Sequence, residues 1–234
     1  MAKVLNTSIM HLLLRANQVA EEWFAKENVT ARTARRLPHA TACLIAILVS
    51  THTMADQQER RFVLDQPIVL EDANGRRTSS AEFAGKWVLA YFGYTHCADL
   101  CPTALSTMAL ALEEIAPADK RIQPLFVTVD PERDHGDILR TFPRSFDARI
   151  IGLGGSVKDV ATAARALGIS FQKVEQPNSA YTIDHSSLFS IIDPAGRTAV
   201  TFKEIAPHQL AARLVTVMEK AGERLEGVNL GAFR

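Results

Sequence analysis

Hydrophobic and polar residues along this chain follow two different periods. Residues 87–93 (WVLAYFG) form an unbroken apolar run of strand length. The segment behind them repeats apolar residues at helical spacing, at Leu105, Met108, Ala109, Leu112 and Ile115. A second apolar run, 125–129, follows. The pattern predicts a buried strand, a helix and another buried strand, the start of an α/β domain.

Shorter segments continue this alternation on both sides. Two strand-like segments, 62–65 and 68–71, precede the turn sequence DANG at 72–75 and predict an N-terminal β-hairpin. Further elements are expected as a helix over 138–142, a strand at 150–151, a helix capped by Ser156 and ended by Gly168, strands 188–192 and 198–202, and a helix with Leu210, Leu214, Val217 and Met218 on one face. The predicted architecture is a thioredoxin-like α/β fold, with an N-terminal β-hairpin and a mixed central sheet flanked by helices.

Two of the three cysteines, Cys97 and Cys101, lie at the joint between the first strand and its helix. If this turn is already helical, the i, i+4 spacing puts both sulfur atoms on one face. A helix N-terminus also stabilises thiolates through its unpaired N–H groups and its partial positive charge, and Pro102 fits such a first turn. The pair suits a soft metal or a disulfide, and a structural pair of buried cysteines is the alternative.

Motifs beyond the cysteine pair occur in a fixed order: YFGYTHCADLCP at 91–102, VTVDPERD at 127–134, DHS at 184–186 and IIDPAG at 191–196. Over about residues 62–221 the chain resembles the Sco/SenC family, thioredoxin-like copper chaperones for cytochrome c oxidase assembly. The resemblance implies that Cys97, Cys101 and His185 are copper ligands. Ala98 stands where the family usually has proline, which bears on the rigidity of the turn and leaves the ligand set unchanged.

This implied ligand set suits both Cu(I) and Cu(II), because thiolates bind the first and an imidazole supports the second. His96 is predicted to point away from its neighbour Cys97 and to support the loop. If it joined the three ligands, the four would fill a tetrahedral zinc site, which is the alternative. Asp99 is expected to tune the thiolates or to meet a partner's basic surface, or simply to favour the helix N-terminus. Asp184 is a supporting residue by its place in the DHS motif.

The function implied by the resemblance is delivery of copper to the dinuclear copper centre of cytochrome c oxidase. The implied partners are the copper-binding subunit of the oxidase and a thioredoxin-like reductant or another copper carrier. Because a disulfide between Cys97 and Cys101 cannot hold copper, oxidation is expected to release or block the metal. A carrier needs no enzyme chemistry, so a metallochaperone is favoured over an enzyme.

Two enzymatic hypotheses stand beside the chaperone. One is a thiol-disulfide reductase that keeps a partner's copper-binding cysteines reduced, although the usual thioredoxin-type site is Cys-x-x-Cys. The other is a peroxidase on the same fold, reacting at Cys97. A second polar cluster at Asp130, Glu132, Asp134 and His135 is expected to cap its loop and face a partner, with a hard-metal site as the alternative.

Composition and charge bound the remaining possibilities. The chain has 234 residues, no net formal charge and 47% hydrophobic residues, enough for one domain plus an extension. Neutral charge and the lack of a basic, aromatic-interleaved stripe argue against nucleic-acid binding. We expect residues 1–55 to be a leader and residues 56–234 to be the thioredoxin-like copper-binding domain.

The expected leader has the parts of a secretory signal: basic residues before position 40, an apolar run at 40–50 and a small-residue exit at 53–55. The run is short for a membrane span, and Glu21, Glu22 and Glu27 argue against a mitochondrial transit peptide. Cys43 lies inside the run and is interpreted as a small hydrophobe. The prediction is a periplasmic protein, either exported or tethered to the inner membrane by this segment.

Overall fold

The computed structural model describes residues 59–115, 120–177, 180–203 and 205–222. The expected leader, with its apolar run, lies outside these ranges. Within them, no helix has both the length and the apolar character needed to cross a membrane. The described residues therefore all belong to the expected copper-binding domain.

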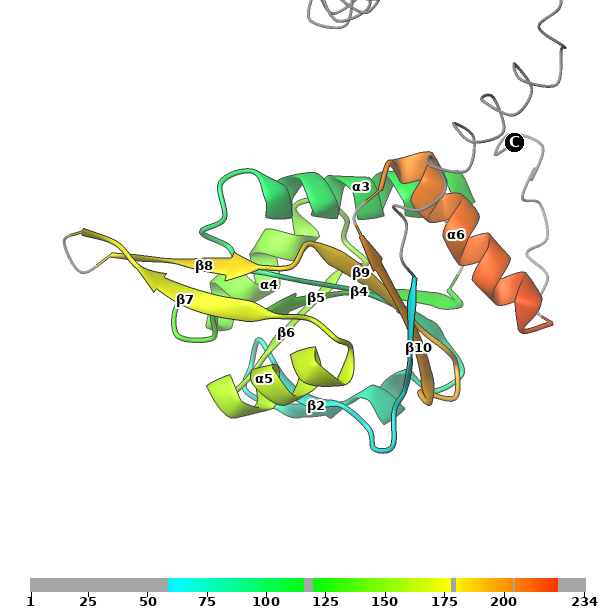
Figure 1. Cartoon of the computed structure of the whole chain (residues 1–234), viewed down its shortest axis with the longest axis horizontal. Coiled ribbons are helices and arrows are strands. Elements are labelled where there is room, and N and C mark those ends of the chain that lie inside the picture. Colours follow the sequence, from blue (N-terminus) through cyan, green and yellow to red (C-terminus); the bar gives the residue numbers. More distant parts are fainter. Residues whose placement is uncertain (1–58, 116–119, 178–179, 204, 223–234) are drawn as a thin grey trace, which may run out of the picture. The chain divides into compact units, whose positions relative to one another are not determined.

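An eight-stranded sheet forms the centre of this domain (Figure 1). Its strands lie in the order β1 (Arg60–Val63), β10 (Thr198–Lys203), β9 (Leu188–Ile192), β4 (Trp87–Gly93), β5 (Ile122–Thr128), β6 (Ile151–Gly154), β2 (Val69–Asp72), β3 (Arg77–Ser79). The β4–β5 and β5–β6 pairs are parallel and the other pairs are antiparallel. The sheet is therefore mixed, as predicted.

Helices cover both faces of the sheet. The flanking elements are η2 (Ser80–Phe83), α3 (Leu100–Ile115), α4 (Gly136–Arg144), α5 (Val157–Ala166) and α6 (Pro207–Lys220). Helices α3 and α6 pack against each other above the sheet in Figure 1, and α5 lies below it beside β2. Every residue of β4 is buried, because helices shield it on both sides. The expected α/β fold with flanking helices is confirmed.

The N-terminal hairpin is formed by different strands from those the pattern indicated. The DANG turn does connect two antiparallel strands, β2 and β3, and Asp72 Oδ1 accepts the backbone N–H of Asn74 at 2.8 Å. β1, however, pairs with β10 at the other edge of the sheet. Because the two segments are close in the sequence, β1 was expected to pair with β2. In the observed pairing with β10, Leu64, the residue after β1, buries its side chain in the core.

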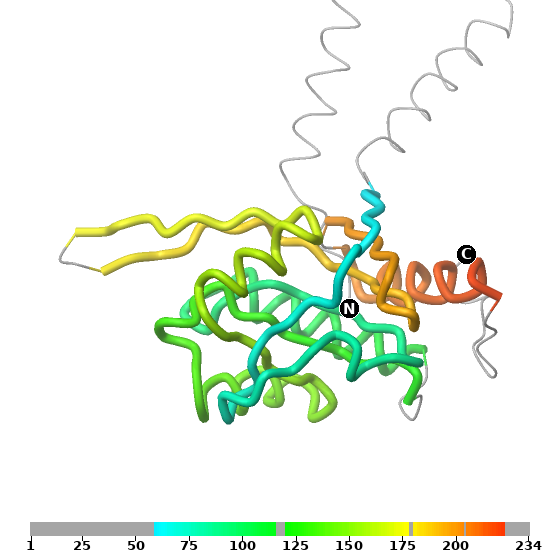
Figure 2. The backbone as a smooth tube through the Cα atoms, turned by 90° about the horizontal axis from the view of Figure 1, so that it is seen from below, coloured from blue at the N-terminus to red at the C-terminus, as the bar shows by residue number. Residues whose placement is uncertain are grey.

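A second hairpin, β7 (Phe171–Glu175) and β8 (Tyr181–His185), was not predicted. Its two strands pair only with each other and form a separate two-stranded sheet. In Figures 1 and 2 this hairpin projects away from the body of the domain. Every residue of β7 except Phe171 is exposed, so the segment lacks the apolar run on which the strand predictions rested.

The predicted helix caps are present. Ser156 Oγ accepts the N–H of Asp159 at the start of α5, and Gly168 follows that helix with φ +65°, a conformation that glycine adopts without strain. Helix α6 buries Leu210, Leu214 and Met218 as expected. Such caps fix where the helix begins and ends.

Candidate metal centre

Cys97 lies in the loop that joins β4 to α3, ahead of the helix. Because α3 begins at Leu100, the segment from Cys97 to Asp99 is not a helical turn. Instead, the N–H of Cys97 donates to the carbonyl of Tyr94 at 3.3 Å, and the N–H of Cys101 donates to Cys97 Sγ at 3.4 Å. The loop thus turns Cys97 back over the helix N-terminus, where a backbone donor meets its sulfur.

Cys101, the second residue of α3, is completely buried. Burial raises the pKa of its thiol, whereas a hydrogen bond from the backbone of Tyr94 lowers it. The helix N-terminus was expected to favour a thiolate, but at Cys101 removal from water dominates. Metal binding here must therefore release the thiol proton.

His185 is the last residue of β8, and its Nε2 lies 3.5 Å from Cys101 Sγ. Its Nδ1 lies 3.3 Å from the carbonyl oxygen of Ser186. Since a carbonyl only accepts, Nδ1 carries the hydrogen and Nε2 presents a lone pair to the sulfur. Burial lowers the pKa of His185, which favours the neutral, ligating form of the imidazole.

Two tyrosine rings flank this imidazole edge to face. The ring of Tyr91 lies 6.3 Å from that of His185 and the ring of Tyr94 lies 5.8 Å away, both near perpendicular. Tyr91 is in β4 and Tyr94 follows the strand directly. Neither tyrosine was predicted as part of the site, although both come from the same motif as the cysteines.

The three predicted ligands come together at one point. One sulfur from each cysteine and one nitrogen of His185 all lie within 4.8 Å of one another. Among the described residues, a search for groups of at least three His, Cys, Asp or Glu side chains that could hold a metal ion finds these three. Two sulfurs and one nitrogen in a largely buried setting suit a soft metal.

Comparison with protein families places most of this domain within one family. The family model described as SCO1/SenC matches residues 56–219. The chain belongs to the SCO1/SenC family. Among curated relatives, the human mitochondrial SCO2 homolog is 36% identical over 149 residues, which cover 60% of this chain and 56% of the relative. This SCO1/SenC chain spans about half the length of the curated relatives it matches.

Solved structures of the SCO1/SenC family share the fold. Copper-bound ScoI from Arabidopsis thaliana is 30% identical, with a TM-score of 0.61, and the match covers 66% of this chain and 98% of that one. Copper-bound ScoI from Bradyrhizobium japonicum is 33% identical, with a TM-score of 0.57, covering 64% of this chain and 96% of that one. The thioredoxin-like fold predicted from the pattern is the fold of these relatives.

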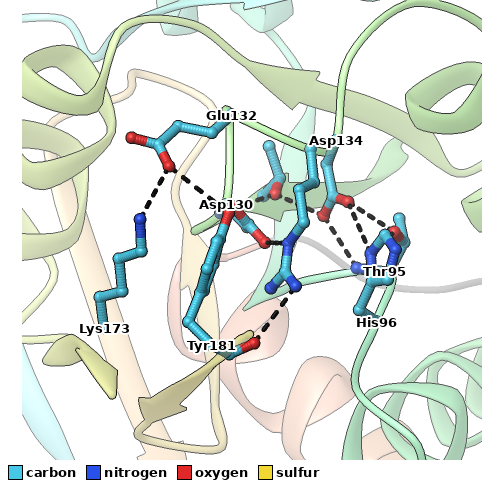
Figure 3. Close-up of polar contacts among 9 residues, drawn as sticks. Thr95, His96, Asp130, Glu132, Asp134, Lys173 and Tyr181 are labelled. Carbon is cyan, nitrogen blue, oxygen red and sulfur yellow. Dashed lines mark hydrogen bonds and ion pairs between the residues drawn. The ribbon is translucent and has the colours of Figure 1, made fainter. Parts of the chain in front are cut away.

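His96 faces away from the thiols of this SCO1/SenC chain. Its Nδ1 lies 3.1 Å from Thr95 Oγ1 and 3.8 Å from Asp134 Oδ1 (Figure 3), and 51% of the side chain is exposed. The four-ligand zinc site would need His96 beside the sulfurs, and the structure does not bring it there. Its predicted role in supporting the loop remains a prediction.

The other supporting residues lie outside the ligand cluster. Asp99 is exposed just before α3, and its carbonyl accepts hydrogen bonds from the N–H and the hydroxyl of Thr103. Asp184 is exposed on β8, between the inward-facing residues Ile183 and His185. Strand alternation therefore directs its side chain away from the thiols.

In the second polar cluster, Asp130 and Asp134 are buried, whereas Glu132 and His135 are exposed. Asp134 accepts hydrogen bonds from the N–H of Thr95 at 2.8 Å and from the hydroxyl of Thr128 at 2.8 Å. Asp130 accepts from the hydroxyl of Tyr181 at 2.9 Å. These contacts hold the loops that carry Cys97 and follow β5, and they satisfy the carboxylates without a hard metal.

Proposed function

We propose that this chain is a copper chaperone that binds copper through Cys97, Cys101 and His185. It then delivers the metal to the dinuclear copper centre of cytochrome c oxidase during assembly. The observation that carries the proposal is the convergence of the two sulfurs and the imidazole nitrogen within 4.8 Å. Copper is bound in the related ScoI structures from Arabidopsis thaliana and Bradyrhizobium japonicum.

The donor set accounts for both oxidation states of copper. Two thiolates hold Cu(I), and the neutral imidazole of His185 adds the nitrogen that Cu(II) prefers. The Nδ1–H bond to Ser186 fixes the tautomer, so the ring does not need to reorganise before it binds. The site is thus prepared for copper before the metal arrives.

Release by ligand exchange follows from unequal burial of the ligands. Cys101 is fully buried, whereas Cys97 and His185 are half-buried. An incoming ligand of the oxidase subunit would therefore reach the metal from the side of Cys97 and His185. Cys101 would be the last contact to break.

Copper titration of the full-length, reduced chain tests this proposal. A Cys43→Ser background removes the third thiol, so that every remaining thiol belongs to the site. We expect stoichiometric Cu(II) in the parent and its loss in Cys97→Ala, Cys101→Ala and His185→Ala, because each removes one ligand; Cu(I) should be lost in the two cysteine variants and bound more weakly in His185→Ala. His208→Ala, which removes an exposed histidine from α6, is the matched control and should bind like the parent. Full affinity in His185→Ala would exclude the three-ligand site.

The two neighbouring thiols also favour a second candidate function, a thiol-disulfide reductase. Both cysteines are free and their sulfurs lie within 4.8 Å. In that reaction the two thiols would reduce a partner's disulfide, becoming a disulfide themselves while the partner gains two thiols and both protons. His185→Ala separates the two functions, because dithiol exchange should survive the loss of the imidazole.

The partners and the location are part of the same proposal. The copper-binding oxidase subunit would receive the metal, and a thioredoxin-like reductant or another copper carrier would act before this chain. A periplasmic location, with the segment 40–50 as an export signal or inner-membrane tether, would put the site on the side where these partners meet it. Fractionation of cells that express the full chain tests this location.

A further inference from the structure

The hairpin that carries His185 has little support from the main sheet. β7 and β8 pair only with each other, and an isolated two-stranded hairpin is at best marginally stable in water. Its position over the thiols therefore depends on side-chain contacts with the body. On β8 these contacts come from alternate residues, Tyr181, Ile183 and His185, since strand side chains alternate between faces.

The first of these residues, Tyr181, is fixed to the loop after β5. Its hydroxyl donates to Asp130 Oδ1 at 2.9 Å, and Arg133 donates from Nε to the other oxygen of the same carboxylate (Figure 3). Arg133 also donates from Nη1 to the carbonyl of Tyr181 at 3.2 Å, and its guanidinium lies over the Tyr181 ring, 3.8 Å from the centroid. Tyr181 is thus held by its hydroxyl, its ring and its backbone.

Burial makes these contacts strong. Asp130 is only 2% exposed, so its charge lies where water does not screen it. The Nη2 atom of Arg133 is buried and has no acceptor among the described residues. The remaining contacts of Arg133 must offset the free-energy cost of this unpaired donor. The nearby ion pair between Lys173 and Glu132 is far more exposed, at 44% and 57%, and pairs of that kind contribute little.

Tyr94 connects this end of the hairpin to His185. Its ring lies 5.9 Å from the Arg133 guanidinium on one side and 5.8 Å from the His185 ring on the other. Tyr181 and His185 lie on the same face of β8, so the contacts of Tyr181 help to hold that face against the body.

We propose that Asp130, Arg133 and Tyr181 form a hairpin latch that positions His185 at the cysteine pair. The inference rests on the proposed function and adds three positioning residues to it. With the latch closed, copper meets two sulfurs and one nitrogen. With the latch open, only the two thiolates remain, which suffice for Cu(I) but are poor ligands for Cu(II). The latch therefore determines how well the site holds the oxidised metal.

Metal-free protein provides the first test. In the full-length, reduced Cys43→Ser chain, the alkylation rate of buried Cys101, followed by peptide mass, reports opening of the hairpin. Tyr181→Phe keeps the ring and removes the hydroxyl, and we expect it to raise this rate about tenfold, from the typical strength of a hydrogen bond to a charged group. Arg133→Lys, which keeps the charge and loses the planar fork, should act in the same direction.

The matched control is Thr182→Val, which removes a hydroxyl from the exposed face of the same strand. It should leave the alkylation rate unchanged. Circular dichroism and thermal unfolding establish that each variant is folded. Equal alkylation rates in the parent, Tyr181→Phe and Arg133→Lys would overturn the latch.

Copper binding provides the second test. Tyr181→Phe should weaken Cu(II) binding about tenfold and change Cu(I) affinity much less, approaching the behaviour of His185→Ala. Parent-like Cu(II) affinity and an unchanged Cu(II) absorption spectrum in both latch variants would also overturn the inference. Failure of the parent itself to bind copper would instead contradict the proposed function, while the alkylation assay would still decide whether the latch exists.

Discussion

Gly93 and Cys101 show how one missing side chain makes room for a ligand. A Cβ atom on Gly93 would lie 2.7 Å from Cys101 Sγ, 3.0 Å from the Tyr91 ring and 3.3 Å from the Phe126 ring. These neighbours are buried and have no free space to move into. The position of the buried thiol therefore depends on the absence of a side chain at Gly93, the last residue of β4.

Gly93→Ala should consequently destabilise the protein by about 1–3 kcal/mol, the usual cost of overpacking a core. Because the closest contact is the Cys101 sulfur, the same change should cost less in a Cys101→Ala background, where this atom is absent. Denaturant unfolding of the parent, the two single variants and the double variant measures the difference. Equal costs in both backgrounds would show that the sulfur is not the obstacle.

Between secondary-structure elements, polar contacts within a turn hold the connection from α4 to β6. Asp147 and Arg149 lie in the turn between α4 and β6. Asp147 Oδ1 accepts the backbone N–H of Arg149 at 2.8 Å, and Oδ2 accepts from its Nη2 at 2.6 Å. The Arg149 guanidinium, helped by this backbone bond and opposed by burial, holds the pKa of Asp147 below its ordinary value.

Since the pKa of Asp147 is lower in the folded than in the unfolded state, its stabilising effect is complete above the ordinary aspartate pKa of about 3.9 and is lost as the pH falls through the folded value. Asp147→Asn should lower the free energy of unfolding by about 1 kcal/mol near neutral pH. The difference between parent and variant should shrink as the pH falls below about 4.

Urea unfolding of both proteins over this pH range measures that difference. Asp65→Asn, at an exposed residue between β1 and β2, is the control and should show little difference at any pH. A parent–variant difference that grows on acidification would contradict the assigned role of Asp147.

At the scale of the whole molecule, the ligand cluster joins distant parts of the chain. Cys101 and His185 are separated by 84 positions, and their contact exists only when α3 and the β7–β8 hairpin are both in place. A metal held by all three ligands therefore binds the folded protein better than the unfolded chain. Copper binding and folding should be coupled.

Cu(I) at about 100 times its dissociation constant should raise the free energy of unfolding of the reduced parent by up to about 2.7 kcal/mol. His185→Ala should gain much less, because its two thiols, close together in sequence, can bind copper in the unfolded chain as well. Anaerobic denaturant unfolding with and without Cu(I) measures both gains. An equal gain in the two proteins would mean that His185 does not contribute to the metal site.

Elements that depend on local sequence pattern could be predicted. The apolar run of β4, the helical period of α3 and the cap at Ser156 each carry their structure in neighbouring residues, so they were predictable. The Cys-x-x-x-Cys spacing and the motif around His185 likewise named the candidate ligands through the family resemblance. The family and its fold followed from the order of these motifs.

Features that depend on residues far apart in the chain could not be predicted from local pattern. Strand β1 pairs with β10 and not with β2, a pairing that places Leu64 in the core and joins segments far apart in the chain. The polar β7–β8 hairpin contains no apolar run from which strands could be predicted. Its position depends on contacts with Asp130, Arg133 and Tyr94 from the body. Burial likewise raised the pKa of Cys101 against the influence of the helix N-terminus. Burial and hydrogen bonds between residues far apart in the sequence thus bring the candidate ligands together in one site.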